Sequence, residues 1–210
     1  MSPQASSQAR QRLLDAAADV VRARGYAATT VDDLCAAAGV TKGSFFHHFK
    51  SKEEMVLAAV AHWDAWTDAI FASAPYAAAD DPRERVFGYL DLRRELLDHP
   101  LPQFTCLLGT LVQETYATHP AVRAACDRGM SSHIARLARD IEAARQLYAP
   151  EASWTAESVG HFIQAVLQGS FIFAKAKLDA DVARGNLAHL RRYLETLLGT
   201  PGVQPSRKEI

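Results

Sequence analysis

One stretch of the chain, from Thr29 to Glu54, constrains the fold more than any other part of the sequence. Thr30 followed by Asp33 is a capping-box pattern, and Ser51 followed by Glu54 is a second one. In this pattern, a hydroxyl at the start of a helix accepts a hydrogen bond from the backbone N–H three residues later. The stretch therefore predicts one helix that begins after Thr30 and another that begins after Ser51.

A tight turn and a third helix start lie between these two positions. Three alanines end at Gly39, a residue that tolerates the left-handed conformation closing a helix. Thr41 can then cap a short helix, in which Phe45 and Phe49 share one face and can pack inward. Two short helices joined by such a turn form a helix-turn-helix, whose second helix typically enters a DNA major groove.

The other faces of this second helix carry side chains that suit contact with nucleic acid. They are Lys42, Ser44, Phe46, His47 and His48. These residue types donate to phosphates, pair with base edges or touch thymine methyl groups. A short helical corner in another kind of α-protein would have the same geometry, but Lys50 and Lys52 directly after the helix favour the DNA-binding interpretation.

Residues 39–53 resemble the DNA-binding signature of the TetR family of bacterial repressors. The similarity extends upstream through a set of seven residues: Ala16, Gly25, Tyr26, Thr29, Thr30, Val31 and Leu34. The resemblance implies an all-helical homodimer with a ligand-binding C-terminal domain. The family usually has Tyr where this chain has Phe46, so we expect contact with a thymine methyl group in place of a phosphate contact at this position.

The resemblance also implies which side chains face DNA. In the family pattern, the positions of Lys42 and Ser44 face bases, those of Phe46, His47 and His48 face bases or phosphates, and that of Lys52 faces phosphate. The complete predicted DNA-binding set is Thr29, Thr30, Thr41, Lys42, Gly43, Ser44, Phe46, His47, His48 and Lys52.

Charge is distributed unevenly along the 210 residues. Residues 1–52 carry seven basic and four acidic side chains, a net charge of +3, whereas the whole chain has a net charge of −1. A basic first quarter beside an acidic remainder suits a DNA-reading domain attached to a domain with another role.

The three cysteines lack Cys-x-x-Cys spacing, so we expect neither a disulfide framework nor a zinc site. The N-terminus lacks an apolar export core, and the most apolar stretch, residues 159–174, is interrupted by polar side chains. We therefore expect a soluble, cytoplasmic protein that does not associate with membranes.

Apolar residues recur with helical spacing throughout, and no strand pattern is present. The sequence predicts an all-α fold of nine helices, among them a sixth helix from residue 103 to about 118. We predict a DNA-binding domain at residues 1–52, a helical ligand-binding and dimerisation domain at 53–200, and a flexible tail at 201–210.

Aromatic and polar residues of the later helices suggest a pocket for a small molecule. The predicted ligand or sensor set is Trp63, Trp66, Phe87, Phe104, Cys106, Gln113, Tyr116, Phe171 and Lys175. The residues around Cys106 also resemble the NemR-like subgroup of the TetR family, which responds to electrophiles and oxidants. Cys106 is then either a reactive sensor, activated by a helix N-terminus and by Lys175, or a buried structural thiol.

The last two predicted helices are apolar on more than one face, which favours a four-helix bundle formed with a second copy. Both could instead be ordinary core helices of a monomer. The predicted dimerisation set is Gly160, Phe162, Val166, Gly169, Leu190, Leu194 and Leu197.

These patterns predict a homodimeric, ligand-responsive transcriptional repressor that releases a palindromic DNA operator when a small molecule or a thiol-reactive electrophile acts on its C-terminal domain. No phosphate-binding Gly-rich loop or metal-ligand motif is present, so we expect no enzyme activity, no cofactor and no metal. The alternative is a helical small-molecule-binding or catalytic protein with a vestigial helix-turn-helix.

Overall fold

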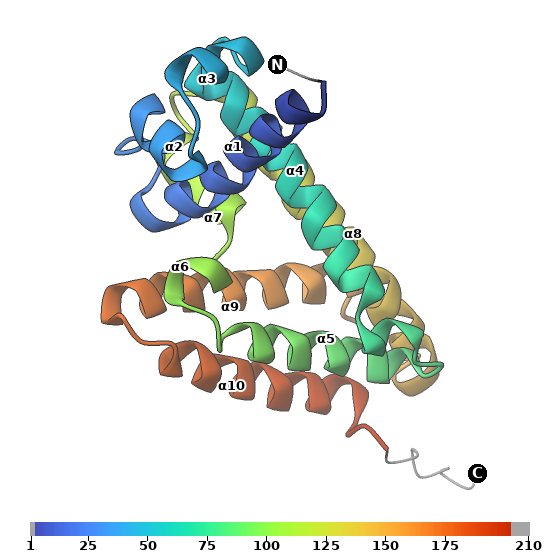
Figure 1. Cartoon of the computed structure of the whole chain (residues 1–210). Coiled ribbons are helices and arrows are strands. Elements are labelled where there is room, and N and C mark those ends of the chain that lie inside the picture. Colours follow the sequence, from blue (N-terminus) through green and yellow to red (C-terminus); the bar gives the residue numbers. More distant parts are fainter. Residues whose placement is uncertain (1–2, 203–210) are drawn as a thin grey trace, which may run out of the picture. The chain divides into compact units, whose positions relative to one another are not determined.

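A computed structural model describes residues 3–202 of the chain. Within this range it contains ten α-helices, one 3-10 helix and no strand (Figure 1). The elements are α1 Pro3–Arg24, α2 Val31–Ala38, α3 Lys42–His48, α4 Lys52–Ser73, η1 Pro75–Ala78, α5 Pro82–Leu96, α6 Leu101–Phe104, α7 Leu107–Thr115, α8 Pro120–Tyr148, α9 Ala156–Lys177 and α10 Asp181–Leu198. The all-α prediction is therefore confirmed.

The one additional helix arises because the predicted sixth helix is divided in two. Its bounds, residues 103–118, were wrong: the chain forms α6 and α7, and Cys106 between them has an extended conformation with φ −86° and ψ 127°. In a continuous helix the Thr105 carbonyl would accept from the Gly109 N–H. Instead, the Gly109 N–H points to Cys106 Sγ at 3.5 Å, and the Thr105 carbonyl lies 3.5 Å from Nη1 of Arg22.

The chain divides into two compact units. The first comprises Met1–Asp68 and Thr105–Ser131, and the second comprises Ala69–Phe104 and Ser132–Ile210. The chain crosses from one unit to the other within α4, between α6 and α7, and within α8. The first unit thus contains more than the predicted DNA-binding residues 1–52. The predicted boundary at residue 52 separates a DNA-binding role from a ligand-binding role, and it stays a prediction. The predicted tail at 201–210 also stays a prediction, because most of it lies outside the described residues.

The core of the first unit joins residues far apart in the sequence. Leu13 of α1, Leu34 of α2 and Phe45 of α3 are fully buried, together with Met55 of α4 and Leu111 of α7. In the second unit, α9 and α10 lie side by side (Figure 1), and α10 also packs on α5. The buried residues of these two helices recur at helical spacing, as in Val159 and Ile163 of α9 and in Leu187 and Leu194 of α10.

Candidate nucleic-acid interface

The turn between α2 and α3 is defined by a left-handed glycine, two backbone hydrogen bonds and a side-chain cap. Gly39 has φ 61° and ψ 42°, so it has the left-handed conformation that its position requires. The Gly39 N–H donates to the Ala36 carbonyl at 3.2 Å, and the Val40 N–H donates to the Cys35 carbonyl at 3.0 Å. Thr41 then caps α3 by accepting from the Ser44 N–H at 3.1 Å. The predicted helix-turn-helix is thus present with its predicted caps.

The starts of the two flanking helices are also capped by hydroxyl groups. Thr30 and Asp33 form the complete capping box at the start of α2. At the start of α4, Ser51 Oγ accepts from the Glu54 N–H at 3.1 Å, whereas the Glu54 carboxylate accepts from the Lys50 N–H. These caps satisfy backbone N–H groups that a helix leaves without partners, and they hold α3 between two defined helix ends.

The side chains of α3 divide into an inner and an outer set. Phe45 and Phe49 are buried, as predicted. Lys42, Gly43 and His47 are exposed. Phe46 is also exposed, with 52% of its surface accessible. A large aromatic side chain that projects from a rigid helix with basic neighbours is available for a partner rather than for the core.

Lys42 lies in an exposed ion pair with a residue of the preceding helix. Its Nζ is 3.0 Å from Oδ1 of Asp32, and both side chains are more than half exposed. An exposed pair of this kind contributes little to stability, so the Lys42 ammonium can leave Asp32 for another acceptor at small cost.

His48, one of the predicted DNA-binding residues, is only partly accessible to solvent. Its Nε2 is buried and has no hydrogen-bond partner within the described residues. Burial lowers the pKa of His48 below its ordinary value, and the nearby charges of His47 and Arg10 lower it further. His48 therefore favours the neutral form, whereas His47 is exposed to solvent.

Lys52 binds the loop between α1 and α2. Its Nζ donates to the carbonyls of Tyr26 and Thr29, both at 2.9 Å, and lies 4.1 Å from the centroid of the Tyr26 ring. A protonated amine has three N–H donors, so one is left for a phosphate. Thr29 is buried and donates to the Gly25 carbonyl at 2.6 Å, which makes it a support of this loop.

Sequence reasoning missed a contribution from α7 to the same loop. Glu114 Oε2 accepts from the Ala27 N–H at 2.8 Å, and the ring of His119 lies edge-on to Tyr26 with centroids 5.0 Å apart. Glu114 and Ala27 are 87 residues apart in the chain, and no local pattern links them. Only packing of α7 beside the loop could show this contact.

The predicted ligand or sensor residues fall in both compact units. Trp63, Trp66, Cys106, Gln113 and Tyr116 belong to the first unit, and Phe87, Phe104, Phe171 and Lys175 belong to the second. Phe104 and Phe171 are buried and in contact, with ring centroids 6.1 Å apart. Cys106 is half-buried, whereas Cys35 and Cys126 are buried. Burial, with a smaller contribution from Cys106, raises the pKa of the Cys126 thiol to about 12.

The predicted dimerisation residues also divide into two groups. Leu190 and Leu194 are buried within the chain, and a Cβ on Gly160 would lie 3.1 Å from a methyl group of Ile134. Phe162 is exposed and packs edge-on against Tyr193 at 5.0 Å between centroids. Val166 and Leu197 are half-buried, and the space beside Gly169 is open. The second group, Phe162, Val166, Gly169 and Leu197, is the one available to a partner.

The described residues contain neither a metal-ligand cluster nor a membrane-spanning helix. No group of three or more His, Cys, Asp or Glu side chains between residues 3 and 202 is arranged to hold a metal ion. Over the same described range, none of the helices has both the length and the apolar character needed to cross a lipid bilayer.

The fold and the capped α2–turn–α3 segment define a helix-turn-helix protein. Two family models match the chain: "Bacterial regulatory proteins, tetR family" at residues 13–59, and "Transcriptional regulator LmrA/YxaF-like, C-terminal domain" at residues 82–184. The chain belongs to the tetR family of bacterial regulatory proteins.

Known relatives agree with this assignment. The HTH-type transcriptional repressor KstR2 of Mycolicibacterium smegmatis is 35% identical over 102 residues, which cover 47% of this chain and 49% of the relative. The transcriptional regulator AcuR of Cereibacter sphaeroides is 28% identical over 182 residues, 84% of this chain and 80% of the relative. The chain thus spans about half the length of KstR2 but most of AcuR.

A solved structure extends the similarity over nearly the whole chain. The reduced form of E. coli NemR superposes with a TM-score of 0.74 at 25% sequence identity, covering 93% of this chain and 100% of NemR. This chain and NemR therefore share a fold over nearly their whole lengths.

Proposed function

We propose that the chain is a transcriptional repressor that binds a palindromic DNA operator as a homodimer and has no enzyme activity. The observation that carries this proposal is the outer face of α3, where Lys42, His47 and Phe46 are exposed on a helix capped at its start by Thr41. Membership of the tetR family and the similarity to named repressors support it. Access to chromosomal DNA places such a protein in the cytoplasm.

In this proposal α3 lies in the major groove. Lys42 leaves Asp32 and binds a base edge. Gly43 and Ser44 lie close to the bases, and Phe46 contacts a thymine methyl group. His47, Thr30 and Thr41 lie on the exposed side, where they can reach phosphates. Lys52 uses its remaining N–H on a phosphate while its other two hold the preceding loop.

A second copy of the chain would supply the other half of the operator contact. Two-fold symmetric dimers bind half-sites about one helical turn of DNA apart. The exposed apolar side chains of α9 and α10, with Phe162 and Tyr193 among them, offer a surface for a four-helix bundle across the two-fold axis. A palindromic operator follows from that symmetry.

Release from DNA would follow when an effector favours a form of the dimer whose half-site spacing no longer fits. Moving the binding-competent fraction from 99% to 1% requires a preference of about 10⁴-fold for the other form. The effector is a small molecule bound by residues of the C-terminal domain, or an electrophile that modifies Cys106. Cys106 is half-buried at the start of α7, whose far end holds Glu114.

The decisive experiment selects DNA from a random pool with the purified protein and then measures binding to the selected fragment over a range of salt concentrations. We expect a palindromic sequence whose affinity falls steeply with salt, because Lys and Arg side chains displace counterions from phosphates. A protein with a vestigial helix-turn-helix would select no sequence.

The role of Cys106 is tested separately with N-ethylmaleimide. Wild type, Cys106→Ser and Cys126→Ser are treated with this electrophile, and operator binding is then measured. We expect release in wild type and in Cys126→Ser, but not in Cys106→Ser. If N-ethylmaleimide releases Cys106→Ser from the operator as readily as wild type, Cys106 is not the sensor, and the small-molecule effector is the remaining explanation.

A further inference from the structure

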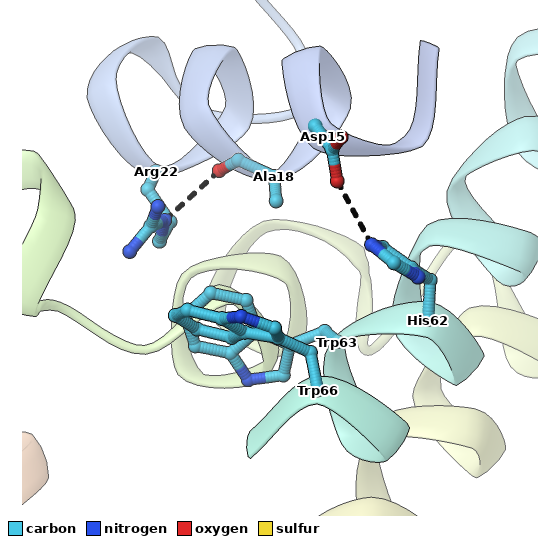
Figure 2. Close-up of a pocket in the computed structure, with 6 residues that line it drawn as sticks. All are labelled: Asp15, Ala18, Arg22, His62, Trp63 and Trp66. Carbon is cyan, nitrogen blue, oxygen red and sulfur yellow. Dashed lines mark hydrogen bonds and ion pairs between the residues drawn. The ribbon is translucent and has the colours of Figure 1, made fainter. Parts of the chain in front are cut away.

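A small cleft lies between α1 and α4, within the first compact unit. It encloses about 90 Å³. Its walls are formed by Asp15, Ala18 and Arg22 of α1 and by His62, Trp63 and Trp66 of α4 (Figure 2). The three α1 residues share one face of their helix because they are spaced by three and four positions. The α4 residues face them from the opposite side.

Arg22 forms a fixed wall of this cleft. Its guanidinium donates to the Ala18 carbonyl at 3.0 Å, pairs with Asp19 and lies 4.6 Å from the centroid of a Trp63 ring. The side chain is buried, and its burial lowers the pKa of Arg22 although Asp19 raises it. One face of Trp63 is thus already covered by a cation of the protein itself.

The groups that remain accessible are an aromatic surface and a carboxylate. Trp66 is 47% exposed, and its ring lies 5.2 Å from that of Trp63 at an interplanar angle of 48°. The side chain of Asp15 is 56% exposed. Asp15 Oδ1 accepts from Gln11 at 3.1 Å and lies 2.9 Å from His62 Nε2, while Oδ2 makes no hydrogen bond within the described part of the chain.

We propose that the α1–α4 cleft is a binding site for a small organic cation, an alkyl- or arylammonium group. Indole rings attract cations through the negative potential of their faces, and tryptophan does so most strongly among the aromatic side chains. Oδ2 of Asp15 supplies the opposite charge at the mouth of the cleft. A cleft of about 90 Å³ is smaller than the roughly 150 Å³ cavity that admits benzene, so it accepts the ammonium head while the rest of the ligand lies along Trp66.

The charges of the cleft disfavour other ligands of the same size. An anion would meet the carboxylate of Asp15 and, beside Arg22, that of Asp19. The Arg22 cation does not attract an anion strongly because Asp19 is already paired with it. A neutral ring could stack on Trp66, but it would gain nothing from Asp15.

The binding step does not depend on the proposed repressor function, whereas its regulatory consequence does. α1 packs on α2 and α3, and α4 begins four residues after α3 ends. A cation held between α1 and α4 therefore acts on the two helices that support the helix-turn-helix. The cleft would add an input within the DNA-binding unit, separate from an effector site in the C-terminal domain.

The test measures binding by quenching of tryptophan fluorescence in the full-length chain. The chain has three tryptophans, and Trp154→Phe removes the one outside the cleft. In this background we titrate benzyltrimethylammonium, benzyl alcohol and benzoate, which carry positive, zero and negative charge. We expect saturable quenching by the cation at a dissociation constant at least about tenfold lower than that of the alcohol, and the weakest binding for benzoate.

Variants separate the contribution of each wall. Asp15→Asn should weaken binding of the cation about tenfold and leave benzyl alcohol unchanged, since only a Coulombic attraction is lost. Asp15→Glu should restore most of the affinity. Trp66→Phe should bind the cation more weakly than wild type, and Trp66→Leu more weakly still. Asp127→Asn removes an exposed carboxylate of the same unit outside the cleft, and it should bind like wild type.

Equal affinity for the three probes, or an unchanged affinity for the cation in Asp15→Asn, would overturn the proposal, as would quenching that does not saturate. Circular dichroism establishes that each variant is folded. Operator binding is measured on the same preparations. Failure of DNA binding with intact cation binding would count against the repressor function only, and the reverse outcome against the cation site only.

Discussion

Lys42, the first residue of α3, and Lys52, the first residue of α4, have different surroundings. Lys42 is exposed, and it forms a surface ion pair with Asp32. Lys52 is half-buried and donates to two backbone carbonyls of the preceding loop. Burial lowers the pKa of Lys52, and the charge of Glu114 partly offsets this effect. At the residue scale, the same side-chain type can therefore serve recognition at one position and loop geometry at the other.

We predict that Lys42→Ala will weaken binding to the selected operator by about 1–3 kcal/mol and relax base preference at one position, because a base contact is lost. Lys52→Ala should weaken binding to all sequences nearly equally and reduce the salt slope by about 0.9 if one phosphate contact is lost. Both are measured by titrating specific and random DNA at several salt concentrations. Asp32→Asn, which retains Lys42, is the control and should not weaken binding. Equal losses on both DNAs for the two lysine variants would contradict this division.

His48 links the stability of the first unit to pH. Its pKa lies below the ordinary value of 6.5, chiefly because of burial. Between these two values the unfolded chain binds more protons than the folded chain, so the free energy of unfolding falls as pH falls. The contribution of His48 is thus present above about pH 6.5 and is lost as pH falls through the folded-state pKa.

We therefore predict that the melting temperature of wild type will fall more steeply between neutral and mildly acidic pH than that of His48→Gln. Thermal unfolding followed by circular dichroism at a series of pH values measures this difference. His47→Gln changes an exposed histidine on the same helix and serves as the matched control. Parallel curves for wild type and His48→Gln would show that His48 does not control acid sensitivity.

At the scale of elements, the loop from α1 to α2 is held from two sides. Lys52 of α4 binds its carbonyls, and Glu114 of α7 binds its Ala27 N–H. Gly25 permits this arrangement because it has φ 84° and because a Cβ at this position would collide with Glu114 Oε1. The start of the helix-turn-helix is thus positioned by a helix almost 90 residues away in the chain.

We predict that Gly25→Ala will lower the free energy of unfolding by about 1–2 kcal/mol from left-handed strain alone, with a further loss from displacement of Glu114. In the Glu114→Ala background the collision is absent, so the same substitution should cost less. Urea denaturation of the two single variants and the double variant gives the coupling free energy. Gly185→Ala, in open space on α10, should be neutral or stabilising. Additive losses would mean that Glu114 does not restrict position 25.

At the scale of the whole molecule, α9 and α10 present more apolar surface than a single chain covers. Phe162, Phe173 and Tyr193 are each more than 40% exposed although they belong to long, well-packed helices. An exposed apolar surface on such helices is typical of an interface. The open space beside Gly169 would let a second helix approach closely.

We predict that Gly169→Arg will convert the proposed dimer into monomers and weaken operator binding, because a charge would enter the contact between the two copies. Outside the backbone of α9 itself and the adjacent residues, no atom of the described chain lies within 4 Å of a Cβ at Gly169, so the substitution should leave the folded chain intact. Sedimentation velocity measures the mass, and operator titration measures the affinity. Gly185→Arg adds the same side chain in open space on α10 and should remain dimeric. An unchanged mass for Gly169→Arg would place the dimer contact elsewhere.

The sequence alone determined those features that depend on neighbouring residues. The capping hydroxyls at Thr30, Thr41 and Ser51, and the left-handed turn at Gly39, were all predicted and are all present, because each depends on contacts within four residues. The inward positions of Phe45 and Phe49 follow from helical spacing for the same reason.

The tertiary structure alone decided which side chains are free to act. Lys52 and Thr29, both predicted to face DNA, also bind the loop before α2, which no local pattern indicated, and Glu114 had no local signal at all. At the break before α7, the Thr105 carbonyl lies 3.5 Å from Nη1 of Arg22, which is 83 residues away, and Cys106 caps α7 instead of lying in the first turns of a longer helix. Hydrogen bonds between distant residues compete with helical ones for the same backbone groups, and no local pattern records the outcome of that competition.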